Sequence, residues 1–398
     1  MSFLEILFWI SLCLVFYTYI GYGILIYLIV KIRECFRKPA LLRIPSDEAL
    51  PPLTLFITAY NEEEVVDKKM RNTLSLDYPS DKLTILWVTD GSNDHTNERL
   101  AAWTEATVLF QPKRQGKTAA MNRGMKAVKT PIVVFTDANT TLNKDALREI
   151  ARAFTNQYVG CVAGEKRIAV HDTDHAAAGG EGLYWKYESA LKSLDDRMTS
   201  AVGAAGELFA IRRHLYKRMP TDTLLDDFVL SLRIVMQGFK IAYCPYAYAV
   251  EGGSADMHEE QKRKVRIAAG GLQAIWRLRP LLNPFRYGMF SFQYISHRVL
   301  RWSITPILLF LLLPLNIALL VTHTHTMLYA VILLLQILFY LAGIRGYLLS
   351  QKNIKNKWLF VPYYFLFMNV NVIKGMVYLS RRKDHSNGSW EKSQRRSE

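Results

Sequence analysis

The chain has long apolar runs near both ends and a long polar middle. Leu4–Val30 is almost wholly apolar, with Glu5 as its only charged residue. A helix of this length would extend about 40 Å, which is enough to cross a membrane. Further apolar runs cover Ile304–Val321, Met327–Leu349 and, as an additional candidate, Leu359–Leu379. The pattern therefore predicts an integral membrane protein.

The polar middle begins at Pro51 and alternates strand-like with helix-like segments. The runs LTLFIT, LTILWVT and PIVVFT are short, apolar and rich in β-branched residues, and a helix-like segment follows each of them. TVLFQ adds a further strand before the helix-like segment GKTAAMNRGMKAV. Strands that alternate with helices favour a parallel sheet with right-handed crossovers, so the expected fold class is α/β.

Polar side chains follow three of the predicted strands, at the points where the strands end. In open sheets of this kind, ligands bind at the carboxyl ends of the strands. The residues there are Tyr60, Asn61 and Glu62 after the first strand, Asp90, Gly91 and Ser92 after the second, and Asp137 and Asn139 after PIVVFT. Taken singly, Asp90-Gly91 is a common turn and Asp137 is a plausible helix cap. Together, these residues predict a polar ligand site on one edge of the sheet.

Two further segments carry charged residues at expected helix starts. RQGKTAAMN places Arg114 and Lys117 on either side of Gly116, where cations and backbone amides suit a diphosphate. A solvated basic loop is the alternative for this segment. TLLDDFVLSLRIV begins a helix with Asp226 and Asp227. The helix dipole alone favours acidic residues there by less than about 1 kcal/mol, so this pair does not by itself indicate catalysis.

The net charge of +15 and the pI near 9.5 suit nucleic acid, an anionic membrane surface or phosphorylated substrates. Lysine and arginine cluster beside the apolar runs and in the expected phosphate loop, and no dedicated nucleic-acid motif is present. We therefore expect membrane lipids as partners and no nucleic acid. Four cysteines without metal-type spacing are expected to be reduced, buried or membrane residues.

Basic residues also predict the orientation in the membrane, because they concentrate on the cytoplasmic side. They follow the first apolar run (Lys31, Arg33, Arg37, Lys38, Arg43), precede the second (Arg298, Arg301) and follow the third (Lys352, Lys355, Lys357). This distribution predicts an outside N-terminus and a cytoplasmic middle. A basic tail after Leu359–Leu379 would then lie outside if that segment spans. Because Asn369 and Asn371 also stand at its centre, we expect it to be re-entrant, bent or partly interfacial.

The ordered set of motifs resembles that of family 2 glycosyltransferases, in particular the membrane-embedded branch of cellulose, hyaluronan and poly-N-acetylglucosamine synthases. The motifs are Tyr60-Asn61-Glu62, Asp90-Gly91-Ser92, Gly116-Lys117, Asp137-x-Asn139, GELFAIRR from Gly206 to Arg213, and Leu225-Asp226-Asp227. The resemblance covers roughly Pro51 to Arg279. It identifies the family and leaves the sugar open.

The resemblance implies a GT-A-like, Rossmann-type nucleotide-sugar domain between N-terminal and C-terminal transmembrane helices. The expected divisions are a transmembrane helix at 1–32, a cytoplasmic catalytic domain at 50–270, interfacial helices at 271–300, a transmembrane region at 301–380 and a basic tail at 381–398. The protein is expected to be a multi-pass protein of the inner membrane.

The resemblance also implies roles for individual residues. It assigns Tyr60, Asn61, Glu62, Asp90, Arg114, Lys117, Asp137, Arg263 and Arg266 to a nucleoside-diphosphate sugar, with uridine as the expected base. The family motif Asp-x-Asp binds Mg²⁺ or Mn²⁺, and here Asp137 and Asn139 hold those places. An amide oxygen can ligate the metal but adds no charge. Asp227 matches the general base of an inverting transfer.

The clearest departure from the family is in EEQKRKVRIAAGG. The synthases carry Gln-x-x-Arg-Trp here; Gln261 matches, but Lys264 and Val265 replace the Arg and the Trp. Loss of the aromatic acceptor platform puts processive synthesis in doubt. The expected enzyme adds a sugar to a glycan or to a lipid-linked acceptor, and an export partner is compatible with it. A processive synthase with its own channel and a non-catalytic nucleotide-sugar-binding scaffold are the alternatives.

Overall fold

A computed structural model describes residues 2–36, 44–169, 176–252, 257–322, 326–351 and 356–381. Several expectations concern residues outside these ranges. They are the basic residues Arg37, Lys38, Arg43, Lys352 and Lys355, and the tail 381–398 apart from Arg381.

A mixed sheet forms the centre of the polar middle of the chain. Its eight strands, within the described part of the chain, follow the order β3-β2-β1-β4-β7-β6-β8-β5. The strands are β1 (Leu53–Ala59), β2 (Leu83–Asp90), β3 (Ala106–Gln111), β4 (Ile132–Asp137), β5 (Thr141–Leu142), β6 (Val159–Ile168), β7 (Leu208–Arg212) and β8 (Lys240–Glu251). The expected parallel sheet is confirmed for β1 to β4, whereas β7 runs antiparallel to β4 and β6.

Strand β1 occupies the point at which the strand order reverses, because it pairs with β2 on one side and β4 on the other. The register aligns Ala59 with Thr89 of β2 and Thr58 with Asp137 of β4. The polar residues that follow these strands therefore lie along one edge of the sheet. This is the position at which open α/β sheets form their ligand crevice.

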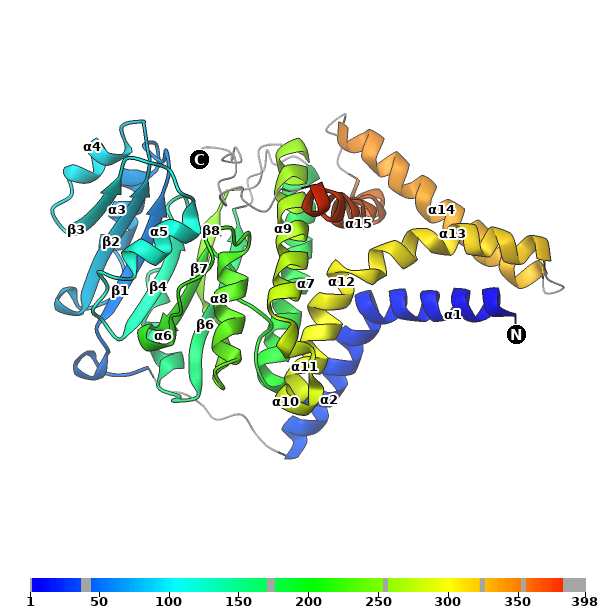
Figure 1. The fold of residues 1–398 in the computed structure, drawn as a ribbon, viewed down its shortest axis with the longest axis horizontal. Helices are drawn as coiled ribbons and strands as arrows, with labels where there is room; N and C mark the ends of the chain where they lie inside the picture. The colour runs from blue at the N-terminus through cyan, green and yellow to red at the C-terminus, as the bar shows by residue number, and fades with distance from the viewer. Residues whose placement is uncertain are drawn as a thin grey trace.

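Helices cover both faces of the sheet (Figure 1). They are α3 (Val66–Leu74), α4 (Thr96–Ala101), α5 (Lys117–Gly124), α6 (Ala146–Phe154) and α8 (Asp226–Val235). Alternate side chains of β1 point to opposite faces: Phe56 packs with α5 and α8, whereas Leu55 and Ile57 pack with α3, α4 and α6. This alternation produces two separate apolar layers, one on each face.

A layer of helices stands between the sheet and the membrane-like helices (Figure 1). It contains α2 (Tyr22–Phe36), α7 (Ala176–Met198), α9 (Met257–Arg277), α10 (Pro284–Tyr287), α11 (Met289–Tyr294) and α12 (Leu300–Trp302). α1 (Phe3–Phe16), α13 (Ile304–Thr322) and α14 (Thr326–Gln351) extend away from the sheet, and α15 (Lys357–Arg381) lies beside α9 and α14.

Buried charges join α7 to the chain segment before α13. Glu188 forms ion pairs with Arg301 and, at 2.8 Å, with Arg298. Asp195 lies 2.6 Å from the Nδ1 atom of His297. Buried charges are tolerated when they are paired in this way, and breaking one pair is costly. The cluster therefore attaches α7 firmly to the chain segment that leads into the apolar helix α13.

Four helices in the described ranges are long and apolar enough to cross a membrane, in agreement with the four apolar runs. The first one changes direction at a π-helical segment, Tyr17–Gly21. Beyond it, Tyr22 and Ile26 pack against Leu191 of α7. Only α1 therefore runs beside α13, and α2 belongs to the helical layer. The fourth segment is one continuous helix, α15, so it contains no re-entrant turn.

Candidate active site

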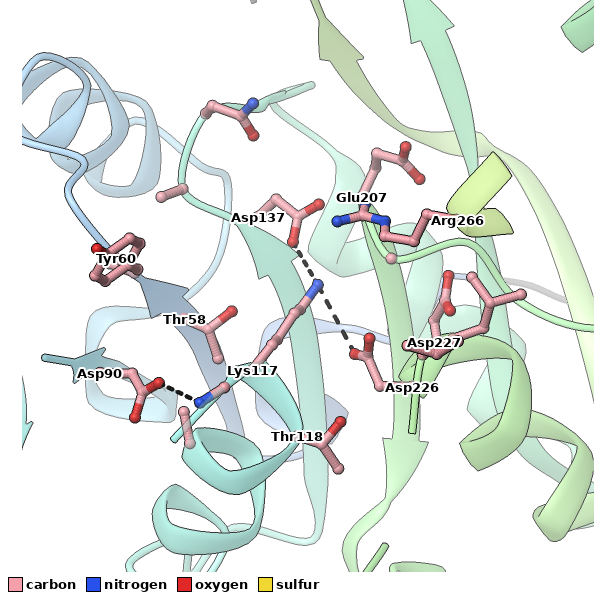
Figure 2. Close-up of a pocket in the computed structure, with 18 of the residues that line it drawn as sticks. Thr58, Tyr60, Asp90, Lys117, Thr118, Asp137, Glu207, Asp226, Asp227 and Arg266 are labelled. Carbon is pink, nitrogen blue, oxygen red and sulfur yellow. Dashed lines mark hydrogen bonds and ion pairs between the residues drawn. The ribbon is translucent and has the colours of Figure 1, made fainter. Parts of the chain in front are cut away.

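A cavity of about 320 Å³ opens at the carboxyl ends of β1, β2 and β4. Its walls come from these strand ends, from the starts of α5 and α8, and from α9. Figure 2 shows side chains from all of these strands and helices converging on it. Every predicted site residue except Asn61 lines the cavity.

Asn61 shapes the loop after β1 instead. Its backbone has a positive φ of 54°, a conformation that asparagine tolerates better than most residues. Its side-chain amide exchanges two hydrogen bonds with Asn93, at 2.7 and 3.0 Å. The Asn61 side chain therefore holds the loops after β1 and β2 together.

Asp90 connects the end of β2 to the basic loop. Its Oδ2 atom accepts hydrogen bonds from the backbone amides of Gly116, at 2.6 Å, and Gln115, at 3.0 Å. Gly91 follows with a φ of 73°, and a Cβ atom there would lie 2.5 Å from the backbone nitrogen of Arg114. Only glycine allows this approach, so the turn brings Arg114 to the cavity.

Arg114 stacks on Tyr60, with its guanidinium carbon 3.7 Å from the ring centroid. Both side chains line the cavity. An aromatic face combined with a planar cation is suited to a base and its phosphates. A nucleobase that uses this face of Tyr60 must displace the guanidinium of Arg114 or stack on it.

Lys117 is the first residue of α5 and lies among three carboxylates. Its Nζ atom donates a hydrogen bond of 2.7 Å to Asp137 and lies 3.8 Å from the Oδ2 atom of Asp226 (Figure 2). Burial alone would lower the pKa of Lys117, but Asp137, Asp226 and Asp227 outweigh it and raise the pKa above its usual range. The side chain therefore remains a cation at the centre of the cavity.

The two expected metal ligands stand at the end of β4. Asp137 contributes a half-buried carboxylate, and the amide nitrogen of Asn139 lies 3.4 Å from Glu251. No group of three His, Cys, Asp or Glu side chains within the described ranges is arranged to hold a metal alone. Mg²⁺ is commonly held by one or two protein oxygens together with substrate phosphates. The donor set fits a metal shared with a diphosphate.

Helix α3 supports the segment Thr136–Thr140, which carries Asp137 and Asn139. The sequence analysis did not predict this support. The buried Nζ atom of Lys69 donates to Thr136 Oγ1 at 3.0 Å, and to the carbonyl and hydroxyl oxygens of Thr140 at 2.8 and 3.1 Å. Burial lowers the pKa of Lys69 to about 7. The buried positions of α3 are Val66, Lys69, Met70 and Thr73. Their helical spacing is the signal that would have identified an inward-facing lysine.

Asp227 lies in the first turn of α8, on the wall next to Lys117 (Figure 2). Its Oδ1 atom accepts a 2.8 Å hydrogen bond from the backbone amide of Phe228. A Cβ atom on Gly206 would lie 3.4 Å from both Asp227 Oδ2 and Lys117 Nζ, so glycine keeps the space between them open. Burial and the neighbouring Asp226 raise the pKa of Asp227 to about 7. A carboxylate with this pKa is well matched to general-base catalysis.

Helix α9 brings two predicted phosphate ligands to the cavity, Arg263 and Arg266. Arg263 is almost fully buried and pairs with Glu260 at 3.0 Å. Lys264 lies 3.3 Å from the same glutamate and, among the described residues, is not part of the cavity wall. Lys264, which stands where the family has arginine, therefore pairs with Glu260 and does not line the cavity.

Two cavity carboxylates were not predicted as site residues, Glu207 and Glu251. The buried ammonium of Lys166 pairs with both of them, at 2.6 Å from Glu251 Oε2. Glu207 stands in the GELFAIRR motif, beside Gly206, and this position was the available signal. The pairing places acceptors of hydrogen bonds on the wall opposite Tyr60.

A family model described as glycosyltransferase like family 2 matches residues 51–270. The chain belongs to this family. The ordered motifs predicted this family, and the cavity lies within the matched residues. The predicted α/β class with a GT-A-like domain is also confirmed.

Relatives of this chain carry names that describe different products. It is 25% identical over 242 residues to a poly-β-1,6-N-acetyl-D-glucosamine synthase of Staphylococcus aureus, covering 58% of this chain and 57% of that one. It is 26% identical over 254 residues to a β-monoglucosyldiacylglycerol synthase of Trichormus variabilis, covering 60% and 53%. The chain thus spans just over half the length of these relatives.

The chain also shares its fold with a solved structure. This is the mannosyltransferase of Pyrobaculum calidifontis in complex with GDP-Man and Mn²⁺, with a TM-score of 0.70 and 22% identity. The match covers 94% of this chain and 99% of that one, so it includes the apolar helices as well as the sheet.

Proposed function

We propose that this glycosyltransferase transfers a sugar, with inversion, from a UDP-sugar to an acceptor at the cytoplasmic face of the inner membrane. The observation that carries the proposal is the position of Asp227, a carboxylate with a pKa of about 7 that shares one cavity with Lys117 and Asp137. A binding scaffold without activity has no use for such a base, which favours the enzyme over a scaffold.

The donor is proposed to lie along the edge formed by the strand ends. Tyr60 and Arg114 offer a stacked surface for the base, and uridine is the base that the family resemblance implies. Asp90 holds the start of α5, where Lys117 and the helix N-terminus favour the diphosphate. Arg266 adds a second cation from α9.

Asp137 and Asn139 are the residues proposed to hold Mg²⁺ or Mn²⁺ together with the diphosphate. The presence of Mn²⁺ and GDP-Man in the mannosyltransferase of similar fold supports this assignment. When bound, such a cation neutralises the charge that develops on the departing nucleoside diphosphate. The single carboxylate and single amide of this chain provide less negative charge than the Asp-x-Asp motif of the family.

Asp227 is proposed to act on the acceptor hydroxyl. The hydroxyl oxygen forms a bond with the anomeric carbon while the bond from that carbon to the β-phosphate oxygen breaks. The hydroxyl proton passes to Asp227, and the bonding electrons leave with UDP. Lys117, 2.7 Å from Asp137, supplies a cation on the leaving-group side. Attack opposite to the departing group gives inversion.

The acceptor is proposed to be lipid-linked and to receive a single sugar. Val265 replaces the aromatic platform of the synthases, and its carbonyl oxygen lies 3.1 Å from the Cβ position of Gly375, so α15 packs closely here. The glucosyldiacylglycerol synthase among the relatives is consistent with a lipid acceptor. A processive synthase is the second candidate, because a poly-N-acetylglucosamine synthase is also among the relatives.

The experiment is a donor and acceptor screen with the purified full-length protein in lipid nanodiscs. Radiolabelled UDP-glucose, UDP-N-acetylglucosamine, UDP-galactose and GDP-mannose are each supplied with diacylglycerol, polyprenyl phosphate or a short glycan. Mass spectrometry then identifies the product, and an α- or β-linkage determined by NMR tests inversion. Transfer from GDP-mannose alone would refute the uridine assignment, and no transfer from any donor would refute the enzyme proposal.

A further inference from the structure

Helix α15 has a direction different from that of the other membrane-like helices. Figure 1 draws α1 and α13 lengthwise across the page, whereas α15 is foreshortened and seen nearly along its axis. By length and composition α15 is able to cross a membrane, yet it is the least apolar of the four candidate spans. Because α1 and α13 extend away from the catalytic domain, a helix that runs across them lies along the membrane plane.

The contacts of α15 keep it on the side of the catalytic domain. Tyr364 Oη lies 3.1 Å from Glu260 of α9, and a Cβ atom on Gly375 would lie 2.7 Å from Ala268 of the same helix. These two contacts are separated by about 16 Å of helix axis. α9 also carries Arg263 into the active-site cavity. A helix that left for the opposite membrane surface would not stay on α9 over this distance.

The start of α15 crosses the end of α14 at very short range. A Cβ atom on Gly346 would collide with the backbone oxygen of Leu359, and one on Gly343 would lie 2.5 Å from the side chain of Leu366. Glycines at the crossing let the two backbones approach, as small residues do in membrane proteins. The crossing holds α15 at the end of α14 that faces the domain.

The polar groups in the middle of α15 face protein. Asn369 accepts a hydrogen bond from Tyr19 and donates one of 2.8 Å to the carbonyl of Phe365. The opposite surface of the helix is different in character. In the C-terminal half of α15 it carries the exposed residues Val370, Lys374, Val377, Tyr378 and Arg381, which helical spacing places on one side. Tyrosine, aliphatic and cationic side chains together are typical of helices in the headgroup layer.

We infer that α15 lies in the headgroup layer of the membrane leaflet next to the catalytic domain, with its exposed surface bound to phospholipid. The helix does not cross, so Ser380 near its C-terminal end lies on the same side as the domain. Lys374 and Arg381 contact anionic headgroups there. α15 thereby ties the lipid surface to α9 and its cavity arginines. This inference concerns the membrane geometry and is independent of the donor and acceptor.

The first test is labelling of single cysteines with a membrane-impermeant maleimide in sealed vesicles of known orientation. The free cysteines Cys13, Cys35, Cys161 and Cys244 are first replaced by serine or alanine. Ser380→Cys is compared with exposed Ser80→Cys on the domain and with exposed Thr322→Cys at the far end of α13. We expect positions 380 and 80 to react from one side and position 322 from the other. Reaction of 380 together with 322 would overturn the inference.

The second test measures depth in the bilayer. Spin labels at the exposed positions Val370 and Val377 lie on one side of α15, about 10 Å apart along its axis. Accessibility to oxygen and to a water-soluble nickel complex reports the depth of each label in vesicles of phosphatidylcholine and phosphatidylglycerol. We expect equal, headgroup-level depths at both positions. Labels at Leu334 and Leu341 of α14, which are also seven residues apart and exposed, are the matched control and should differ in depth. A clear depth difference between 370 and 377 would show that α15 crosses.

Discussion

Replacing Asp227 with asparagine removes one negative charge from the cavity and preserves the shape of the side chain. The 2.8 Å hydrogen bond from the amide of Phe228 can still be accepted by the asparagine oxygen, so the first turn of α8 should keep its structure. The positive charge of Lys117 stays in place beside Asp137. The change therefore tests the basicity of the group with little disturbance of donor binding.

The expected loss follows from what a positioned base contributes. General-base catalysis typically accounts for about 10²–10⁴-fold in rate, which corresponds to about 2.7–5.4 kcal/mol of transition-state free energy. The pKa of Asp227, about 7, puts the residue in the range where a base is effective at neutral pH. We therefore expect kcat to fall by 10²–10⁴-fold. The Kd for UDP should change much less than kcat, because Lys117 keeps its hydrogen bond to Asp137.

The assay compares single-turnover transfer and UDP binding by calorimetry for wild type, Asp227→Asn and the matched control Asp226→Asn. Asp226 lies 3.8 Å from Lys117, and the control should retain more activity. Wild-type activity should fall as the pH drops through about 7, because the base must be ionised to accept a proton. In Asp226→Asn the pH at which activity falls should be lower. Burial still raises the pKa of Asp227 in this variant, but the negative charge of Asp226, the second cause of the raised pKa, is gone.

Three results would refute this reasoning. Wild-type kcat in Asp227→Asn would show that the proton goes elsewhere. An equal loss of kcat and of UDP affinity would show that Asp227 binds the donor and is not the base. If the activity of Asp226→Asn falls at the same pH as that of wild type, a group other than Asp227 controls the pH dependence of activity.

Three further predictions concern metal, loop support and product length. Asp137→Ala should abolish transfer, whereas Asn139→Asp should preserve it and lower the Mn²⁺ concentration for half-maximal activity; full activity in excess chelator would contradict both. Lys69→Met removes the buried hydrogen-bond donor to Thr136 and Thr140. It should lower the free energy of unfolding by about 1–3 kcal/mol, measured as a lower melting temperature. An unchanged melting temperature would exclude a supporting role for Lys69. The product should be short because Val265 offers no aromatic platform; high-polymer product from the purified protein, resolved by size-exclusion chromatography, would overturn this.

Much of the cavity could be predicted because the relevant residues follow directly from local patterns. Each buried strand ends at a polar residue, and the parallel arrangement of β1, β2 and β4 brings those ends to one edge. Asp90, Lys117 and Asp137 could thus be placed together without coordinates, and all three line the cavity. The same logic did not predict the direction of the Asn61 side chain, because the direction of a loop side chain depends on its partner, Asn93.

Contacts between residues far apart in the sequence could not be predicted. Lys69 reaches Thr140, and Lys166 reaches Glu251, through packing that only the folded sheet creates. The raised pKa of Asp227 likewise depends on burial in the assembled cavity. Hydrophobic periodicity and residue spacing carry no information about which helix covers which charge. The sequence therefore indicated none of these contacts, except that Lys69 stands at helical spacing from the buried positions of α3.

The sequence by itself determined the family, the α/β alternation, the four apolar helices and the edge of the sheet on which the site lies. These depend on hydrophobic periodicity and on motif order, which are local properties of the chain. Only the tertiary structure decided that the first helix changes direction at Tyr17–Gly21 and that α15 runs across α1 and α13. An apolar run is long enough to span in either direction, and its tilt is set by the neighbours against which it packs, such as Glu260 and Gly346 for α15.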